Sequence, residues 1–197
     1  MAEKYEGRKF ETVFVADRLP DDSRIAEIME WGARLHAMGL LPDEHGGHAG
    51  NMSFRNSRGF VITAGGVGKG TLKPADFVQV LSCNVDTRKV EAEGQLEPSS
   101  ETLTHHMIYR ERPEINAVVH VHDSLVICHA AELRLGETGR EHPYGTPELA
   151  REVAESLGHK KYLVVKGHGV IAVGRSLWEA CMQVITVHGD ASALQGK

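Results

Sequence analysis

Residues 116–122 read Asn-Ala-Val-Val-His-Val-His, and this stretch indicates how the rest of the chain folds. Its β-branched and small apolar residues are typical of a buried strand. Successive side chains of a strand point to opposite faces, so His120 and His122 lie on the same face as Val118. The other face then carries Ala117, Val119 and Val121. Two imidazoles on one face, close to the end of a strand, can bind a single metal cation.

A third histidine lies between two glycines in Gly167-His168-Gly169. Glycine lets the backbone approach a ligand closely, because it has no side chain. Three imidazoles are the ligand set of a catalytic zinc site whose fourth position stays open for water or substrate. The alternative is that His120 and His122 are buried sheet histidines that bond to backbone carbonyls. The presence of two histidines on one face, together with His168, favours the metal site.

A second motif, Pro98-Ser99-Ser100-Glu101, lies at the start of a helix predicted from Ser100 to about Arg112. In the structural interpretation, a serine caps the helix and Glu101 complements the helix dipole. In the functional interpretation, the serines and the N–H groups of the first turn bind an anion such as phosphate. Glu101 would then lie close to the histidine-bearing strand, where a carboxylate can act as a general base.

A third region combines Gly50-Asn51 with the glycine-rich loop Gly65-Gly66-Val67-Gly68-Lys69-Gly70. The loop is not a P-loop, because no serine or threonine follows Gly68-Lys69. It is either a flexible turn or a site that offers backbone amides and Lys69 to an oxyanion.

The remaining pattern predicts a mixture of helices and strands. Helices are predicted over 22–38, 100–112, 124–132 and 147–157, and a last one begins with the capping box Ser176-Leu-Trp-Glu179. Further strands are predicted over 52–55, 59–63, 77–81, 89–91, 162–166 and 170–173. Because several strands follow one another directly, we expect an α/β fold with a mostly antiparallel sheet. No repeat or linker is visible, so we expect one domain over residues 1–197, with residues 1–21 as an N-terminal extension.

The composition is that of an ordinary globular protein, with 197 residues, 41% hydrophobic residues and a formal net charge of −5. This charge gives no reason to expect nucleic-acid binding. No apolar stretch is long enough to span a bilayer, and residues 1–20 contain no apolar signal segment. Cys83, Cys128 and Cys181 are odd in number and widely spaced, as expected of reduced thiols. We therefore expect a cytoplasmic protein without a membrane partner.

Six segments occur in the order and spacing of a known family, namely 50–55, 60–66, 72–78, 98–101, 112–122 and 167–170. From about residue 23 to about residue 190, the chain resembles the class II aldolase/adducin family. The resemblance implies three layers (α/β/α) around a mostly antiparallel sheet, and a homotetramer. It also implies that His120, His122 and His168 bind Zn²⁺ or another divalent metal, and that Glu101 is the catalytic acid/base. The substrate phosphate would be held by Asn51, Gly65, Gly66, Ser99 and Ser100.

The same resemblance implies a small sugar phosphate as the substrate. The first expectation is a zinc-dependent aldolase that reversibly cleaves a ketose 1-phosphate, such as L-fuculose 1-phosphate, to dihydroxyacetone phosphate and an aldehyde. The alternative is a zinc-dependent methylthioribulose-1-phosphate dehydratase, and a minor alternative is a non-catalytic, adducin-like interaction module. The chain departs from the aldolases at Thr63-Ala64-Gly65-Gly66, where a hydroxyl expected to bind phosphate is missing.

Overall fold

The computed structural model describes residues 7–44 and 47–195. Its centre is an eight-stranded sheet in the order β1-β7-β6-β5-β4-β8-β10-β9. All neighbouring strands are antiparallel except β1 and β7, which are parallel. The strands are β1 (Glu11–Ala16), β4 (Asn51–Asn56), β5 (Gly59–Thr63), β6 (Phe77–Asn84), β7 (Lys89–Glu93), β8 (Ala117–Val121), β9 (Tyr162–Val165) and β10 (Gly169–Gly174). A separate small hairpin pairs β2 (Asp43–Glu44) with β3 (Gly47–His48).

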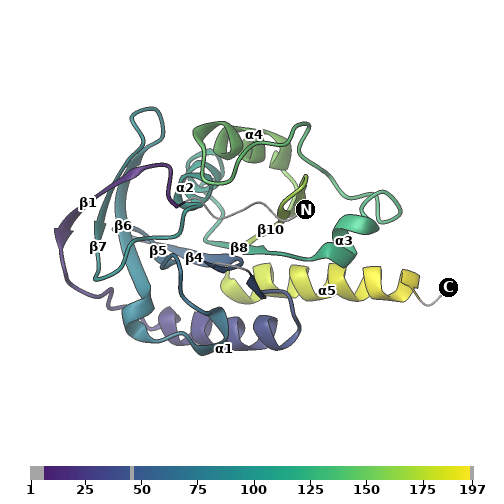
Figure 1. Ribbon diagram of the computed structural model, residues 1–197, viewed down its shortest axis with the longest axis horizontal. Helices are drawn as coiled ribbons and strands as arrows, with labels where there is room; N and C mark the ends of the chain where they lie inside the picture. The colour runs from purple at the N-terminus through teal and green to yellow at the C-terminus, as the bar shows by residue number, and fades with distance from the viewer. Residues whose placement is uncertain (1–6, 45–46, 196–197) are drawn as a thin grey trace.

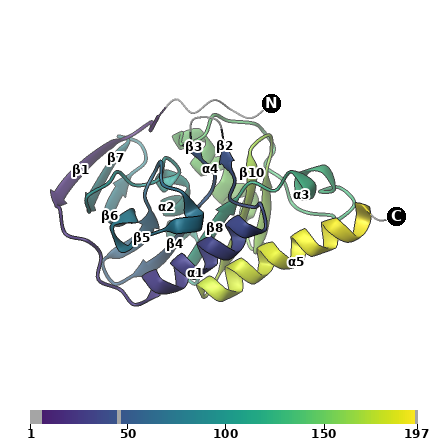
Figure 2. The ribbon, with the colours of Figure 1, turned by 60° about the horizontal axis from the view of Figure 1, so that its bottom comes forward.

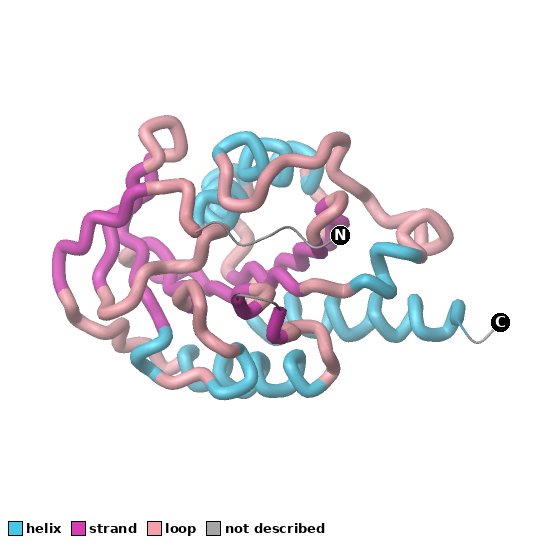
Figure 3. The backbone as a smooth tube through the Cα atoms, viewed as in Figure 1, coloured by secondary structure: helices cyan, strands magenta, loops and turns pink. Residues whose placement is uncertain are grey.

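Helices cover both faces of the sheet, which gives the three layers visible in Figure 1 and, coloured by secondary structure, in Figure 3. One face carries α1 (Arg24–Ala37) and α5 (Leu177–Gln195), which run alongside each other in Figure 2. The other carries α2 (Thr102–Glu111) and α4 (Pro147–Leu157). The short helix α3 (Ser124–Cys128) follows β8, and two single-turn 3₁₀ helices, η1 (Lys69–Thr71) and η2 (Pro74–Asp76), precede β6. The α/β class with a mostly antiparallel sheet is therefore confirmed.

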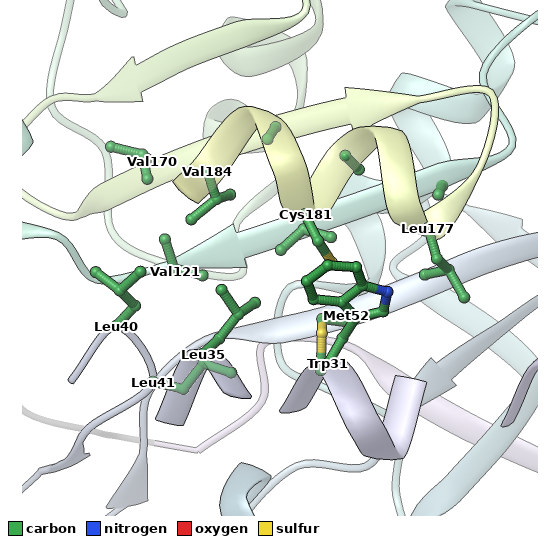
Figure 4. Close-up of a cluster of buried hydrophobic side chains, with 14 of the residues drawn as sticks. Trp31, Leu35, Leu40, Leu41, Met52, Val121, Val170, Leu177, Cys181 and Val184 are labelled. Atoms are coloured by element: carbon green, nitrogen blue, oxygen red, sulfur yellow. The ribbon is translucent and has the colours of Figure 1, made fainter. Parts of the chain in front are cut away.

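Two hydrophobic clusters hold the layers together. Beneath α1 and α5, Trp31 and Leu35 pack with Met52 of the sheet and with Cys181 of α5 (Figure 4). The second cluster packs α2 and α4 on the opposite face of the sheet. Every residue of β8 is buried, because this strand is covered on both faces. None of the helices in the described part of the chain combines the length and apolar character needed to cross a membrane.

The strand predicted from the histidine-bearing stretch is confirmed as β8, and its faces alternate as expected. Val118 belongs to the cluster under α2 and α4, whereas Val119 and Val121 belong to the cluster under α1 and α5. The helix over 147–157 is confirmed with its predicted ends. Thr146 Oγ1 accepts a hydrogen bond from Leu149 N, and Gly158 ends the helix with φ +49°.

The helix predicted over 124–132 is shorter than expected, since α3 ends at Cys128. After this point the amide of Ala130 bonds to the carbonyl of Ile127, three residues earlier. The chain then takes a left-handed conformation at Arg134, with φ +54°. The irregular turns place Leu133 and Leu135 against the core.

The N-terminal region and the last helix also differ from expectation. Part of the region predicted as an extension forms β1, an edge strand of the main sheet. The capping box of α5 forms only in part. Glu179 N donates to Ser176 Oγ at 3.1 Å, but the Glu179 carboxylate accepts from Arg175 N and pairs with Lys161. The charge on Lys161 draws the carboxylate away from the backbone of Ser176.

The turn before β4 depends on a glycine. Gly50 has φ +71°, and a Cβ there would lie 2.6 Å from the carbonyl oxygen of His120 and 2.3 Å from a methyl group of Leu41. We expect Gly50→Ala to lower the free energy of unfolding by about 2 to 5 kcal/mol, from left-handed strain and overpacking together. Gly39→Ala is the matched control, because Gly39 has φ +76° with nothing within 4 Å. Equal losses in urea unfolding of the two variants would contradict the steric part of this prediction.

Candidate metal centre and active site

Three neighbouring strands bring the predicted site residues to one end of the sheet. β8 lies between β4 and β10. In the β4–β8 register Asn51 is directly opposite His120, and in the β8–β10 register Ile171 is opposite His120. The hairpin loop between β9 and β10 therefore ends beside β8, and this loop carries His168. Gly167 takes φ +70° within it, and His168 N bonds to Val165 O.

The structure brings His120, His122 and His168 together. Their available ligand atoms all lie within 4.8 Å of one another. The rings of His120 and His168 are stacked with centroids 5.0 Å apart, and His122 meets both edge-on at 5.1 and 5.0 Å. Three nitrogens at this spacing can converge on one cation.

The surroundings of His120 suit a metal ligand. Its Nδ1 lies 2.9 Å from Val170 O, which fixes the proton on Nδ1 and leaves a lone pair on Nε2. Burial lowers the pKa of His120 to about 3, so the ring is neutral at pH 7. Nε2 has no hydrogen-bond partner among the described residues, although Glu101 Oε2 lies 3.1 Å away. Two acceptors facing each other in a buried site are stabilised by a cation between or beside them, so the residues present fit a divalent metal.

Glu101 lies immediately before α2 and points at the histidines. Its Oε1 is 2.7 Å from His168 Nε2, and its Oε2 accepts a hydrogen bond from Asn51 Nδ2 at 2.8 Å. Burial favours the neutral acid, but the hydrogen bonds that the carboxylate accepts from His168 and Asn51 hold the pKa of Glu101 well below its usual range. Glu101 is only 6% exposed. A carboxylate in this position can accept a proton from a molecule bound at the histidines.

One turn further along α2, His105 ties this helix to the sheet. The Nδ1 atom of His105 lies 2.7 Å from Ser53 Oγ of β4. Burial lowers the pKa of His105 to about 4, so its ring is also neutral. The same two elements are therefore joined twice, by His105–Ser53 and by Glu101–Asn51, which fixes Glu101 relative to β8.

The predicted phosphate-binding residues lie close together around one cavity, which has a volume of about 350 Å³. The loop after β5 runs beside the segment before α2, since Gly65 N bonds to Glu97 O and Ser99 N bonds to Thr63 O. Gly65, Gly66, Ser99 and Ser100 line this cavity together with the three histidines and Glu101. Asn51 also lines it, but its amide nitrogen already donates to Glu101.

The structure adds residues to the cavity wall that the motifs did not indicate. Asp123 is 3% exposed and lines the cavity. Its Oδ1 accepts from Val126 N at the start of α3, and its Oδ2 lies 2.8 Å from His188 Nδ1 of α5. The position of Asp123 next to His122 was a sequence signal, but the contact with His188, 65 residues away, was not. Ile127 of α3 adds an apolar side chain.

We expect the purified protein to bind one divalent metal ion per chain at the three histidines. His122→Gln and His168→Gln should each lose the metal after dialysis, because two imidazoles do not provide the ligand set of a structural or catalytic site. His159→Gln, at an exposed histidine that does not line the cavity, is the control and should keep the metal. Elemental analysis measures the metal content, and retention by the two site variants would contradict the site.

Gly169 provides the space that the histidines occupy. A Cβ at this position would lie 2.7 Å from His120 Cε1, 3.1 Å from His122 Cδ2 and 2.6 Å from Val121 O. We expect Gly169→Ala to weaken metal affinity by about 10- to 100-fold, as displaced ligands do. Gly189→Ala is the control, since nothing lies within 4 Å of an added Cβ there. Titration against a chelating indicator measures the metal affinity of both variants. An unchanged affinity in Gly169→Ala would show that the imidazole rings can move without weakening metal binding.

Comparison with known proteins agrees with this geometry. The chain is 33% identical over 156 residues to a 5-methylthioribulose-1-phosphate/5-deoxyribulose-1-phosphate aldolase of Rhodospirillum rubrum, covering 72% of this chain and 68% of that protein. It is 31% identical over 177 residues to a methylthioribulose-1-phosphate dehydratase of Leptospira biflexa, covering 71% and 83%. The crystal structure of L-fuculose-1-phosphate aldolase from Thermus thermophilus superposes with a TM-score of 0.70 at 27% identity, covering 86% of this chain and 91% of that one.

A family model, the Class II Aldolase and Adducin N-terminal domain, matches residues 26–193. This range includes the strands β4, β8 and β10, the three histidines and Glu101. The expected family resemblance is therefore confirmed, and the chain belongs to the class II aldolase and adducin N-terminal domain family.

Proposed function

We propose that this chain is a metal-dependent lyase that cleaves a ketose 1-phosphate to dihydroxyacetone phosphate and an aldehyde. One observation carries the proposal. The Glu101 carboxylate is held between His168, at 2.7 Å, and Asn51, at 2.8 Å, beside a cluster of three histidines. An interaction module would have no need for a buried carboxylate facing three imidazoles, because each buried polar group lowers stability unless it is compensated.

The three histidines would hold Zn²⁺ or another divalent metal. When bound, the metal supplies Lewis-acid chemistry, polarising the carbonyl and adjacent hydroxyl oxygens of the ketose. The phosphate would lie against Gly65, Gly66, Ser99 and Ser100, where the loop after β5 meets the start of α2. Asn51 would keep the Glu101 carboxylate oriented through its amide hydrogen bond.

Glu101 would carry the proton at the carbon that changes bonding. In the direction of aldol addition, the carboxylate removes a proton from the carbon of dihydroxyacetone phosphate next to its carbonyl. The electron pair left on this carbon forms the new bond to the aldehyde carbonyl carbon, while the π electrons of that carbonyl move to its oxygen, which takes up a proton from solvent. In cleavage the same steps reverse, so the protonated Glu101 returns the proton to carbon after the carbon–carbon bond breaks.

A second candidate is dehydration of methylthioribulose 1-phosphate. It is favoured by the similarity to a methylthioribulose-1-phosphate dehydratase over 83% of the length of that protein. In this reaction Glu101 again removes a proton beside the carbonyl, and the electron pair left behind forms a double bond to the neighbouring carbon. The hydroxyl group on that carbon takes up the proton from Glu101 and leaves as water. Because both reactions begin with the same proton transfer, the substrate determines which follows.

The deciding experiment compares wild type with Glu101→Gln. We expect Glu101→Gln to keep its metal but to lose about 10²- to 10⁴-fold in turnover, the usual contribution of a general acid or base. Glu111→Gln, an exposed position on the same helix, is the control. The assays supply dihydroxyacetone phosphate with lactaldehyde or acetaldehyde, and methylthioribulose 1-phosphate in parallel.

Each outcome separates the candidates. Aldol product from wild type alone supports the aldolase. Turnover of the methylthio sugar with loss of water supports the dehydratase, and full activity of Glu101→Gln would exclude the proposed role of this residue. A protein without metal and without activity would instead be an interaction module.

We also propose that the chain forms one domain, that it is cytoplasmic, and that it assembles as a homotetramer. Sedimentation of the purified protein measures the oligomeric state.

A further inference from the structure

The loop after β5 contains a buried lysine that the proposed mechanism does not use. Lys69 is 2% exposed, yet it lines the same cavity as the histidines. Within the part of the chain that the structure describes, its Nζ donates one hydrogen bond, to Val67 O at 2.7 Å. An ammonium group has three donors, and among the described side chains no carboxylate forms an ion pair with Lys69.

Such a charge is unfavourable in the ligand-free protein. Burial lowers the pKa of Lys69 to about 8, although Asp43, Asp76 and Glu101 act at longer range to raise it. Asp43 is paired with His48, and Asp76 accepts a hydrogen bond from Lys73 N. Neither carboxylate therefore compensates the ammonium directly. A buried ammonium is stabilised when an anion binds beside it.

The cavity wall around Lys69 lacks other cationic side chains for an anion. Ala64, Gly65 and Gly66 provide no side-chain donor, and among the described residues that line the cavity Lys69 is the one lysine or arginine. The Ser99 hydroxyl already takes part in one hydrogen bond, because its Oγ accepts from Glu101 N. A dianionic phosphate held by amides and hydroxyls alone would meet no full positive charge from the cavity wall, apart from the metal. Arg8 Nη1 lies 4.0 Å from the position of a Cβ at Gly65, but this guanidinium is already paired with Glu97 at 3.3 Å.

We propose that the Lys69 ammonium is the cationic anchor for the phosphate group of the substrate, in the cavity that Lys69 lines together with Gly65 and Gly66. This inference rests on the proposed function and extends it. The role is one of binding, so Lys69 should lower the KM for phosphorylated substrates and leave the chemical step unchanged.

The test uses sulfate as a probe, because it stays a dianion across the pH range of interest. Calorimetry on the full chain, with its metal and after EDTA treatment, measures sulfate affinity of wild type, Lys69→Met and Lys73→Met. We expect Lys69→Met to bind sulfate about 10- to 100-fold more weakly, from the loss of a charge-assisted hydrogen bond. Lys73→Met, in the same loop but exposed and outside the cavity, should bind as wild type does. Equal affinities of all three would overturn the proposal.

The pH dependence gives an independent readout. The charged and titratable groups facing Lys69 are Asp43, Asp76 and Glu101, with the imidazoles of His36 and His48 packed against the neighbouring glycines. Carboxyl and imidazole groups ordinarily titrate below about pH 7. Above pH 8 the Lys69 ammonium of the free protein loses its proton. Above pH 8 we expect the sulfate affinity of the wild type to fall with increasing pH, with a limiting slope of about 10-fold per pH unit. The sulfate affinity of Lys69→Met should not change over the same pH range. A parallel fall in both would contradict the proposal.

Kinetics separate an anchor from a proton donor. Lys69→Met should raise the KM for dihydroxyacetone phosphate about 10- to 100-fold at nearly unchanged kcat. Aldol addition with unphosphorylated dihydroxyacetone should be unaffected. A fall in kcat at unchanged KM would make Lys69 a proton donor and overturn the proposal. Lys69→Gln replaces Lys69→Met if the latter does not fold. The sulfate measurements need no turnover, so their failure is distinguishable from failure of the proposed function.

Discussion

The register of β8 between β4 and β10 is the constraint on which the site depends. It places Asn51 opposite His120 on one side and brings the loop with His168 alongside on the other. A slip by one residue would turn His120 into the core beneath α1 and α5, because side chains alternate along a strand. The packing of Val119 and Val121 in that core fixes the register. Hydrophobic burial on one face thus positions the polar groups on the other.

That polar face is buried but incompletely satisfied. His120 Nε2 and Asn51 Oδ1 have no hydrogen-bond partners in the described part of the protein. Unsatisfied groups in a core lower stability, so these two atoms, in a cavity that also holds Glu101 and two further imidazoles, mark it as a site for ligands. Gly50 and Gly169, where an added Cβ would lie 2.6 Å from the carbonyl oxygens of His120 and Val121, provide the space for this crowding. The fold therefore prepares positions for a cation and for an anion within a single cavity.

The local sequence predicted the elements with strong periodicity or clear end signals. β8, α4 and the turn containing His168 were such cases. β1 was not found, because Val13, Phe14 and Val15 are 38–54% exposed at the edge of the sheet and do not alternate between faces. The end of α3 was misplaced, since its apolar pattern continues through Leu133 while tertiary packing turns the backbone. The capping box of α5 is only partial because the Glu179 carboxylate pairs with Lys161. Lys161 lies between α4 and β9, so no local pattern around α5 contains it.

The sequence by itself determined the candidate metal ligands and the general base, because each belongs to a short motif in which spacing and residue type already indicate the chemistry. It also determined the α/β class through the succession of strands and helices. Only the tertiary structure decided that Asn51 orients Glu101, that Asp123 meets His188, and that Lys69 is buried with no carboxylate paired to it among the described side chains. These relations join residues that are distant in the chain or depend on burial. Burial and long-range contacts are set by how the layers pack, which no local pattern specifies.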